Sequence, residues 1–232
     1  PVGHRTGRPD LLVRTEGGYL PGIIRAYRVF DSRADASTLV SPLARLAAPV
    51  EVPGLRLRWR YRWHLVLRLA HYHRMLEAIG LAASGARGLL VGDDPLEELG
   101  QVAAWLDLTE PSVPLAGGQP HEADADQTSA LERYDYEFAQ RLELALLATG
   151  PDPDAGGADL LPIRSRECER CAWWPVCQPQ LDEDDLSLRI SKSPLDPHEI
   201  RVLRRSGIVT VADLATADLD ALLPDYLPQV NH

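Results

Sequence analysis

The chain has 232 residues, which is enough for one α/β domain of about 150 to 200 residues with a small appendage. Hydrophobic residues make up 45% and charged residues 25%, an ordinary globular composition that excludes a fibrous or wholly disordered chain. No apolar stretch approaches the roughly 20 residues that a membrane-spanning helix needs, so no membrane partner is expected.

The net charge of -10 is distributed unevenly along the chain. Residues 1–90 hold 14 arginines against 6 acidic residues, whereas residues 91–161 hold 2 arginines against 16 acidic residues. A basic block beside a cleft would suit a phosphate backbone, whereas the acidic middle would repel one. Alternatively, the arginines reflect a general usage bias, because Lys192 is the only lysine.

The N-terminal part predicts a β-hairpin over residues 10–30. The run DLLVR is apolar and extended, TEGG has turn chemistry, and YLPGIIRAYRVF resumes with β-branched and aromatic residues. Residues 31–56 carry Pro42, Pro49 and Pro53 among small residues. This composition predicts a loop.

Apolar residues at helical spacing predict a helix over residues 60–79, with Gly80 as its stop, and these residues are Leu65, Leu69, Tyr72, Leu76 and Ile79. The segments ARGLLVG and QVAAWLDL predict two short strands around the acidic loop DDPLEELG. The stretch PSVPLAGGQPHEADADQ is too rich in proline, glycine and acidic residues to pack, so it is expected to be a surface excursion.

A second long helix is predicted over residues 130–148. Ser129 and Glu132 form a capping box ahead of an apolar stripe, and Gly150 follows its end. The stripe consists of Leu131, Tyr134, Phe138, Leu142 and Ala145. The last element, residues 196–223, predicts two short helices around a glycine turn.

Three cysteines, Cys168, Cys171 and Cys177, stand in the pattern C-x2-C-x5-C within ECERCAWWPVC. Thiolates this close together are typical ligands of zinc or of an iron–sulfur cluster. Buried structural cysteines are the alternative, and a disulfide framework is disfavoured, so a cytoplasmic location is expected. Both kinds of centre usually take four protein ligands. Either His198 or a cysteine in an absent N-terminal part would supply the fourth.

The pattern C-x2-C-x5-C resembles part of the [4Fe-4S] clasp of RecB-like nucleases in the PD-(D/E)xK superfamily. In these nucleases a fourth cysteine lies far upstream. The CRISPR-associated exonucleases and the AddB-type helicase–nucleases belong to this group. The resemblance implies an α/β restriction-endonuclease-like core, a mixed sheet flanked by helices, over residues 1–162 with its N-terminal part missing. A cysteine-cluster segment would follow over 163–181 and a small helical appendage over 182–232. The cluster would be chiefly structural, shielded by Trp173, Trp174 and Pro175.

The resemblance extends to GRPDLLVR, which is similar to the motif whose aspartate, here Asp10, coordinates Mg2+ or Mn2+. It places Ile23 at the acid position and Arg25 at the lysine position of the (D/E)-x-K pair. Metal-dependent phosphodiester cleavage needs two or more carboxylates and a cation that positions or activates the attacking water. Ile23 supplies no oxygen ligand, and Arg25 can clamp phosphate without serving as a base.

RLAHY aligns with the Q-x3-Y motif of the same family, with Tyr72 retained and Arg68 at the glutamine position. The exposed stripe of His64, Arg68, His71 and Arg74 would then present basic groups toward the cleft. The alternatives are a core tyrosine and a solvated helix face.

The segment EIRVLRRSGIVTVADLATADLDAL resembles a helix-hairpin-helix unit. Its first helix would end at Ser206 and Gly207, and Thr210 can cap the second. In such units the hairpin amides, here around Gly207, bind a DNA phosphate without reading sequence. Two short helices packed around a glycine turn are the alternative.

Three functions are therefore open. The first is a DNA nuclease with Asp10, Arg25 and Tyr72 at its catalytic positions. The second is a non-catalytic module of the same fold that binds DNA through Arg25, Arg68 and Gly207. The third is a zinc-stabilised scaffold. The expected partner for the first two is single- or double-stranded DNA.

Overall fold

A computed structural model of the chain describes residues 3–114, 127–150, 157–189, 195 and 197–230. The chain divides into two compact units, Pro1–Ala139 and Gln140–His232, and each is described by itself. Among the described residues, no helix is long and apolar enough to cross a membrane.

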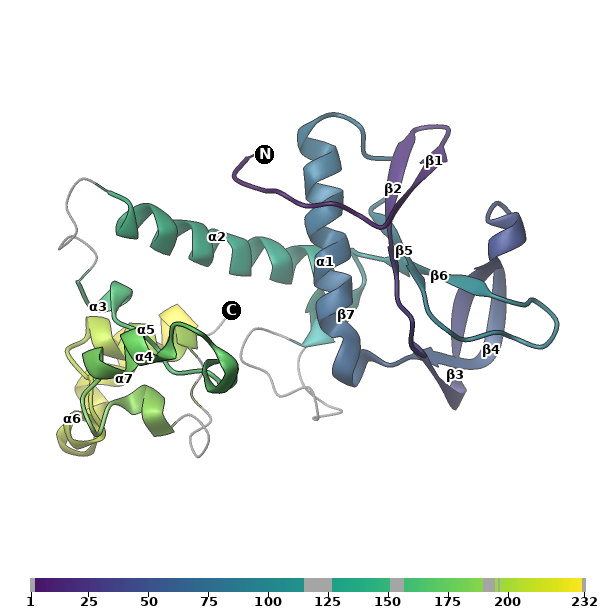
Figure 1. Ribbon diagram of the computed structural model, residues 1–232. Coiled ribbons are helices and arrows are strands. Elements are labelled where there is room, and N and C mark those ends of the chain that lie inside the picture. The colour runs from purple at the N-terminus through teal and green to yellow at the C-terminus, as the bar shows by residue number, and fades with distance from the viewer. Residues whose placement is uncertain (1–2, 115–126, 151–156, 190–194, 196, 231–232) are drawn as a thin grey trace. The chain divides into compact units, whose positions relative to one another are not determined.

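The first unit is built on a six-stranded mixed sheet (Figure 1), whose strands are β1 (Leu11–Thr15), β2 (Gly18–Ile24), β3 (Phe30–Pro42), β4 (Val50–Leu57), β5 (Arg87–Val91) and β6 (Val102–Asp107). Their order across the sheet is β1-β2-β5-β6-β3-β4. β1 and β2 form the predicted antiparallel hairpin, β5 runs parallel to β2, and β6 is antiparallel to both β5 and β3. The α/β class and a mixed sheet are therefore confirmed.

The expected loop over residues 31–56 is wrong, because most of this segment forms the antiparallel hairpin of β3 and β4. Its prolines occupy places that a strand tolerates. Pro42 ends β3 and Pro49 precedes β4, while Pro53 lies in β4, the edge strand of the sheet. An edge strand loses no ladder hydrogen bond when the missing N–H faces outward.

Helix α1 (Trp59–Ala78) packs on the sheet, as predicted, and its apolar stripe enters the main core. Leu65, Leu69, Tyr72 and Leu76 are all buried, but Ile79 is 50% exposed and lies outside the stripe. The helix ends one residue before Ile79 because Gly80 adopts φ 70° and its N–H bonds to the carbonyl of Glu77.

Helix α2 (Ala130–Ala148) begins at the predicted capping box. The Glu132 N–H donates to Oγ of Ser129 at 3.2 Å, and the Ser129 N–H donates to Oε2 of Glu132 at 3.1 Å. Only the first turns of α2 carry buried side chains, so these turns belong to the first unit. The two compact units divide between Ala139 and Gln140. The short strands β7 (Pro111–Pro114) and β8 (Gln127–Ser129) precede α2 as a two-stranded sheet.

The second unit contains the end of α2 and a set of short helices, which are α3 (Gly157–Leu160), α4 (Trp174–Cys177), α5 (Pro197–Arg205), α6 (Val211–Thr216) and α7 (Leu219–Val230). Its small core consists of Leu186, Leu203 and Ile208. Where two C-terminal helices were predicted there are three, because Asp218 accepts the first N–H groups of α7 and starts a new helix.

Candidate functional site

Asp10 and Arg25 meet at one end of the first hairpin, because β1 and β2 are antiparallel and Asp10 precedes β1 while Arg25 follows β2. Oδ2 of Asp10 accepts the Ile24 N–H at 2.9 Å and a hydrogen bond from Nη1 of Arg25 at 3.0 Å. The Arg25 side chain is 19% exposed and that of Asp10 is 39% exposed. The carboxylate at the expected metal position is thus neutralised by an arginine of the same hairpin.

The neighbouring position, Ile23, is fully buried and packs in the main core. It offers neither an oxygen ligand nor access to solvent. Across the described residues, no group of three His, Cys, Asp or Glu side chains is placed to hold a metal ion. This end of the hairpin therefore provides one carboxylate, which is already paired, where a divalent cation would need several oxygen ligands.

The two residues at the aligned Q-x3-Y positions contact each other. Nε of Arg68 donates to Oη of Tyr72 at 2.9 Å, and the guanidinium lies 5.7 Å from the tyrosine ring centroid. Tyr72 is 4% exposed, whereas Arg68 is exposed. Tyr72 is therefore a core tyrosine whose hydroxyl orients an arginine on the surface of α1.

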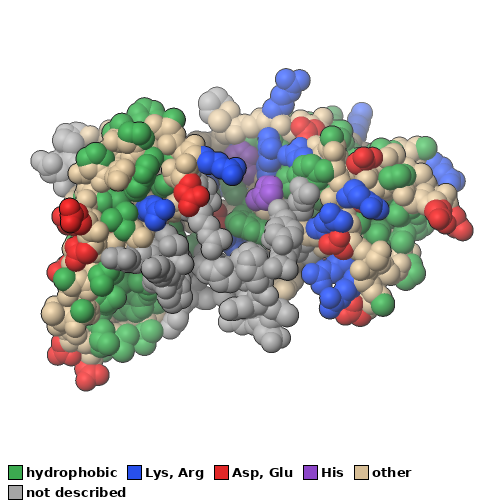
Figure 2. Space-filling view, turned by 60° about the horizontal axis from the view of Figure 1, so that its bottom comes forward, with side chains coloured by type: hydrophobic (Ala, Val, Ile, Leu, Met, Phe, Trp, Pro, Cys, Tyr) green, Lys and Arg blue, Asp and Glu red, His purple; other side chains and the backbone are tan. Residues whose placement is uncertain are grey.

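The expected basic stripe on α1 is only partly available to a ligand. His64 and Arg68 are exposed, but Arg74 hydrogen-bonds Asp135 on α2 and Glu77 on its own helix. These hydrogen bonds, with that to Asp135 the strongest, raise the pKa of Arg74. Figure 2 shows arginine and histidine side chains gathered on the first unit.

Sequence reasoning missed Asp94, which it placed in an acidic loop. This carboxylate is 4% exposed, accepts the Val29 N–H at 2.5 Å and lies 3.3 Å from Nε of Arg28. It follows β5, which is parallel to β2, so it fixes the turn that carries both Arg25 and Arg28. The available signal was an aspartate pair directly after a buried strand, GLLVGDD.

Cys168, Cys171 and Cys177 are free thiols in consecutive short turns. Sγ of Cys168 accepts a hydrogen bond from the Ser165 N–H, with the nitrogen and sulfur 3.3 Å apart. The donor types fit a thiolate metal centre, although the three sulfurs are not gathered as a ligand set among the described residues. Trp173, expected to shield the cluster, is 70% exposed.

The alternative fourth ligand, His198, lies on α5 with its Nε2 2.8 Å from the carbonyl oxygen of Gln229. Since a carbonyl only accepts, Nε2 carries the proton in this contact. That nitrogen is engaged within the C-terminal helices, so the structure gives no support to His198 as a cluster ligand.

The turn around Gly207 has the predicted glycine geometry, with φ 82°. The Gly207 N–H bonds to the carbonyl of Arg204, and the Thr210 N–H bonds to Oδ2 of Asp213 at 2.8 Å. The hydrogen bonds that Asp213 accepts, from the Thr210 N–H first and also from the Val209 N–H, lower its pKa. The start of α6 therefore binds the protein's own carboxylate in the place where a phosphate would be expected.

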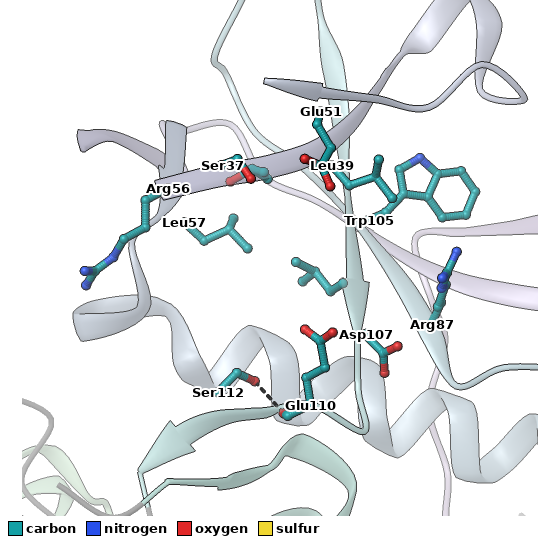
Figure 3. A pocket seen from close by; sticks show the side chains of 12 residues that line it. Ser37, Leu39, Glu51, Arg56, Leu57, Arg87, Trp105, Asp107, Glu110 and Ser112 are labelled. Carbon is teal, nitrogen blue, oxygen red and sulfur yellow. Dashed lines mark hydrogen bonds between the residues drawn. The ribbon is translucent and has the colours of Figure 1, made fainter. Parts of the chain in front are cut away.

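A cavity of about 330 Å³ lies where β3 and β6 diverge (Figure 3). Glu51 and Glu110 turn their carboxylates toward it from opposite walls, and Asp107, Arg56 and Arg87 also line it. Acidic side chains predominate over the two arginines. A phosphate group would be repelled here, so this cavity does not belong to the candidate DNA site.

No family model, curated protein or solved structure matched the chain. Its function therefore has to be argued from the residues and their geometry.

Proposed function

We propose that the first unit is a RecB-nuclease-like module that binds the DNA phosphate backbone and has lost metal-dependent hydrolysis. The ion pair between Asp10 and Arg25, 3.0 Å across, carries this proposal. Hydrolysis at such a site needs a free carboxylate set around a divalent ion. Here the one carboxylate is neutralised, and the position of its partner, Ile23, is part of the core.

Arg25 and Arg68 are the proposed phosphate ligands. Nη1 of Arg25 bonds to Asp10 and to the carbonyl oxygen of Ile24, but a guanidinium carries five N–H groups in all. Its remaining groups suit the oxygens of a phosphate, which accept charge-assisted hydrogen bonds. Arg28 follows on the same turn, where its Nε bonds to Asp94 while its side chain is 73% exposed, and we propose it as a third phosphate ligand.

The test is equilibrium binding of a fluorescent 20-nucleotide strand and of the matching duplex at several salt concentrations. We expect Arg68→Ala and Arg28→Ala each to weaken binding severalfold and to reduce the salt slope by about 1. Arg33→Ala is the matched control, because Arg33 is an exposed arginine on β3 that pairs with Asp35. Equal DNA affinity in the wild type and all three variants, or an affinity that does not fall as the salt concentration rises, would refute the proposal.

The cysteines support a second proposal that concerns the second unit. We propose, from residue chemistry, that Cys168, Cys171 and Cys177 are ligands of a [4Fe-4S] cluster, with zinc as the alternative. Such a centre would stabilise short helices that otherwise enclose only a small core.

A further inference from the structure

Residues 3–9, which we call the N-terminal strap, run across α1 and the first turns of α2. The guanidinium of Arg5 lies 4.0 Å from the ring centroid of Phe138, and its Nε donates to Oη of Tyr134 at 2.9 Å. Gly7 sits directly on Tyr72 and His71. A β-carbon on Gly7 would lie 2.7 Å from Cε1 of Tyr72, so only glycine permits this approach.

One chain of hydrogen bonds ties the strap to both helices. Nε2 of His71 lies 3.0 Å from the carbonyl oxygen of Thr6, which can only accept, so Nε2 carries the proton. In the tautomer that carries its proton on Nε2, Nδ1 accepts from Oη of Tyr134 at 2.8 Å. The Tyr134 hydroxyl in turn accepts from Arg5. We call this series of hydrogen bonds, from Arg5 through Tyr134 and His71 to the Thr6 carbonyl, the relay. Each donor in it has an acceptor.

The strap covers the part of α1 that carries His71 and Tyr72. Tyr72 is buried beneath Gly7, and the N–H of His71 points at a carbonyl oxygen, which has the same acceptor character as a phosphate oxygen. If the strap lifts, His71, Tyr134 and the Tyr72 edge are uncovered beside Arg68. These groups are the donors and cations that bind a phosphate backbone.

We infer that the N-terminal strap is an autoinhibitory lid, in which the Thr6 carbonyl substitutes for a DNA phosphate on α1. This inference rests on the proposed DNA binding and names its regulation. When a site is open for only a fraction of the time, the measured dissociation constant rises by the inverse of that fraction. Any change that opens the strap without touching a DNA-binding group should therefore tighten binding.

Gly7→Ala is the most direct test, because it pushes the strap off Tyr72 and leaves every donor and charge in place. Tyr134→Phe removes two hydrogen bonds of the relay, which should raise the open fraction about tenfold. Tyr226→Phe is the control, since it deletes a hydroxyl that bonds Glu199 in the second unit. The two readouts are the rate of trypsin cleavage after Arg5, followed by mass spectrometry, and affinity for the 20-nucleotide strand.

We expect faster cleavage after Arg5 in both strap variants, tighter DNA binding in Gly7→Ala, and no change in the control. Unchanged cleavage would show that the relay does not hold the strap. Faster cleavage with unchanged DNA affinity would overturn the inhibitory role while leaving the proposed function intact. Failure of every protein, including Gly7→Ala, to bind DNA would overturn both proposals.

Discussion

Arg204 and Asp185 form an ion pair with Nη2 and Oδ2 2.8 Å apart, in which the two side chains are 0% and 2% exposed. The same guanidinium donates to the carbonyl oxygens of Leu161 and Pro162, and the other oxygen of Asp185 accepts from Ser187. The pair thus joins α5 to two segments that are distant in sequence. It is a buried polar anchor of the second unit.

Removing one partner of this pair should unfold the second unit more easily. Asp185→Ala leaves the Arg204 guanidinium buried without its counter-charge, at a cost of about 3 to 5 kcal/mol. Denaturant unfolding followed by circular dichroism measures the change. As a control, Asp35→Asn breaks an exposed pair with Arg33 and should leave the unfolding midpoint unchanged. A loss of stability no larger than in that control would show that the buried pair is dispensable.

Stability should depend on pH through His73, whose side chain is 3% exposed and lies 3.3 Å from Oε1 of Glu77. Burial lowers the pKa of His73, with Arg74 contributing and Glu77 opposing. The unfolded chain therefore takes up a proton at higher pH than the folded chain does. The contribution of the buried, uncharged His73 to the free energy of unfolding is fully present above the unfolded histidine pKa of about 6.5. It is lost as the pH falls through that value toward the lower folded pKa.

Urea unfolding of the wild type and of His73→Phe between pH 7.5 and 5.5 tests this assignment. The wild type should lose stability with a slope of at most about 1.4 kcal/mol per pH unit from this one group. The variant should show a flatter profile. His64→Gln, on the exposed face of the same helix, should keep the wild-type profile. If the free energy of unfolding falls equally with pH in His73→Phe and in the wild type, the buried imidazole does not cause the pH dependence of stability.

The cysteine proposal predicts a coloured protein when purification is anaerobic. The expected content is about four iron atoms per chain, with a broad visible absorbance that Cys171→Ser abolishes. A content of one zinc atom and no iron per chain would show that the cysteines bind zinc instead of an iron–sulfur cluster. Protein that binds neither metal, with all three thiols reactive toward a thiol reagent, would remove the metal centre altogether.

Helix periodicity and capping chemistry predicted α1 and α2 well, because both signals are local in the sequence. The β3 and β4 hairpin was missed because Pro42, Pro49 and Pro53 read as loop residues. Pro42 and Pro49 flank the strands, and Pro53 is tolerated because β4 lies at the sheet edge, which is a property of the whole sheet. The third C-terminal helix was missed because Val211, Leu214 and Leu219 keep an apolar spacing that hides the cap at Asp218.

The candidate site was only partly visible in the sequence. Alignment of motifs proposed Asp10 and Arg25 as candidate positions, and the hairpin register brings them together. That the two neutralise each other follows from side-chain geometry, which the motif spacing does not encode. The strap depends on a hydrogen bond between Arg5 and Tyr134, 129 residues apart, and no local pattern predicts such a contact.

Cleavage of an end-labelled linear DNA in the presence of Mn2+ tests the central claim most directly, with binding measured on the same preparation. Because the Asp10 carboxylate is paired with Arg25 and Ile23 is buried, the account predicts salt-sensitive binding and no cleavage above the buffer control. Gly7→Ala should also bind without cutting, which excludes a nuclease site hidden by the strap. Mn2+-dependent cleavage that Asp10→Ala abolishes would contradict the account.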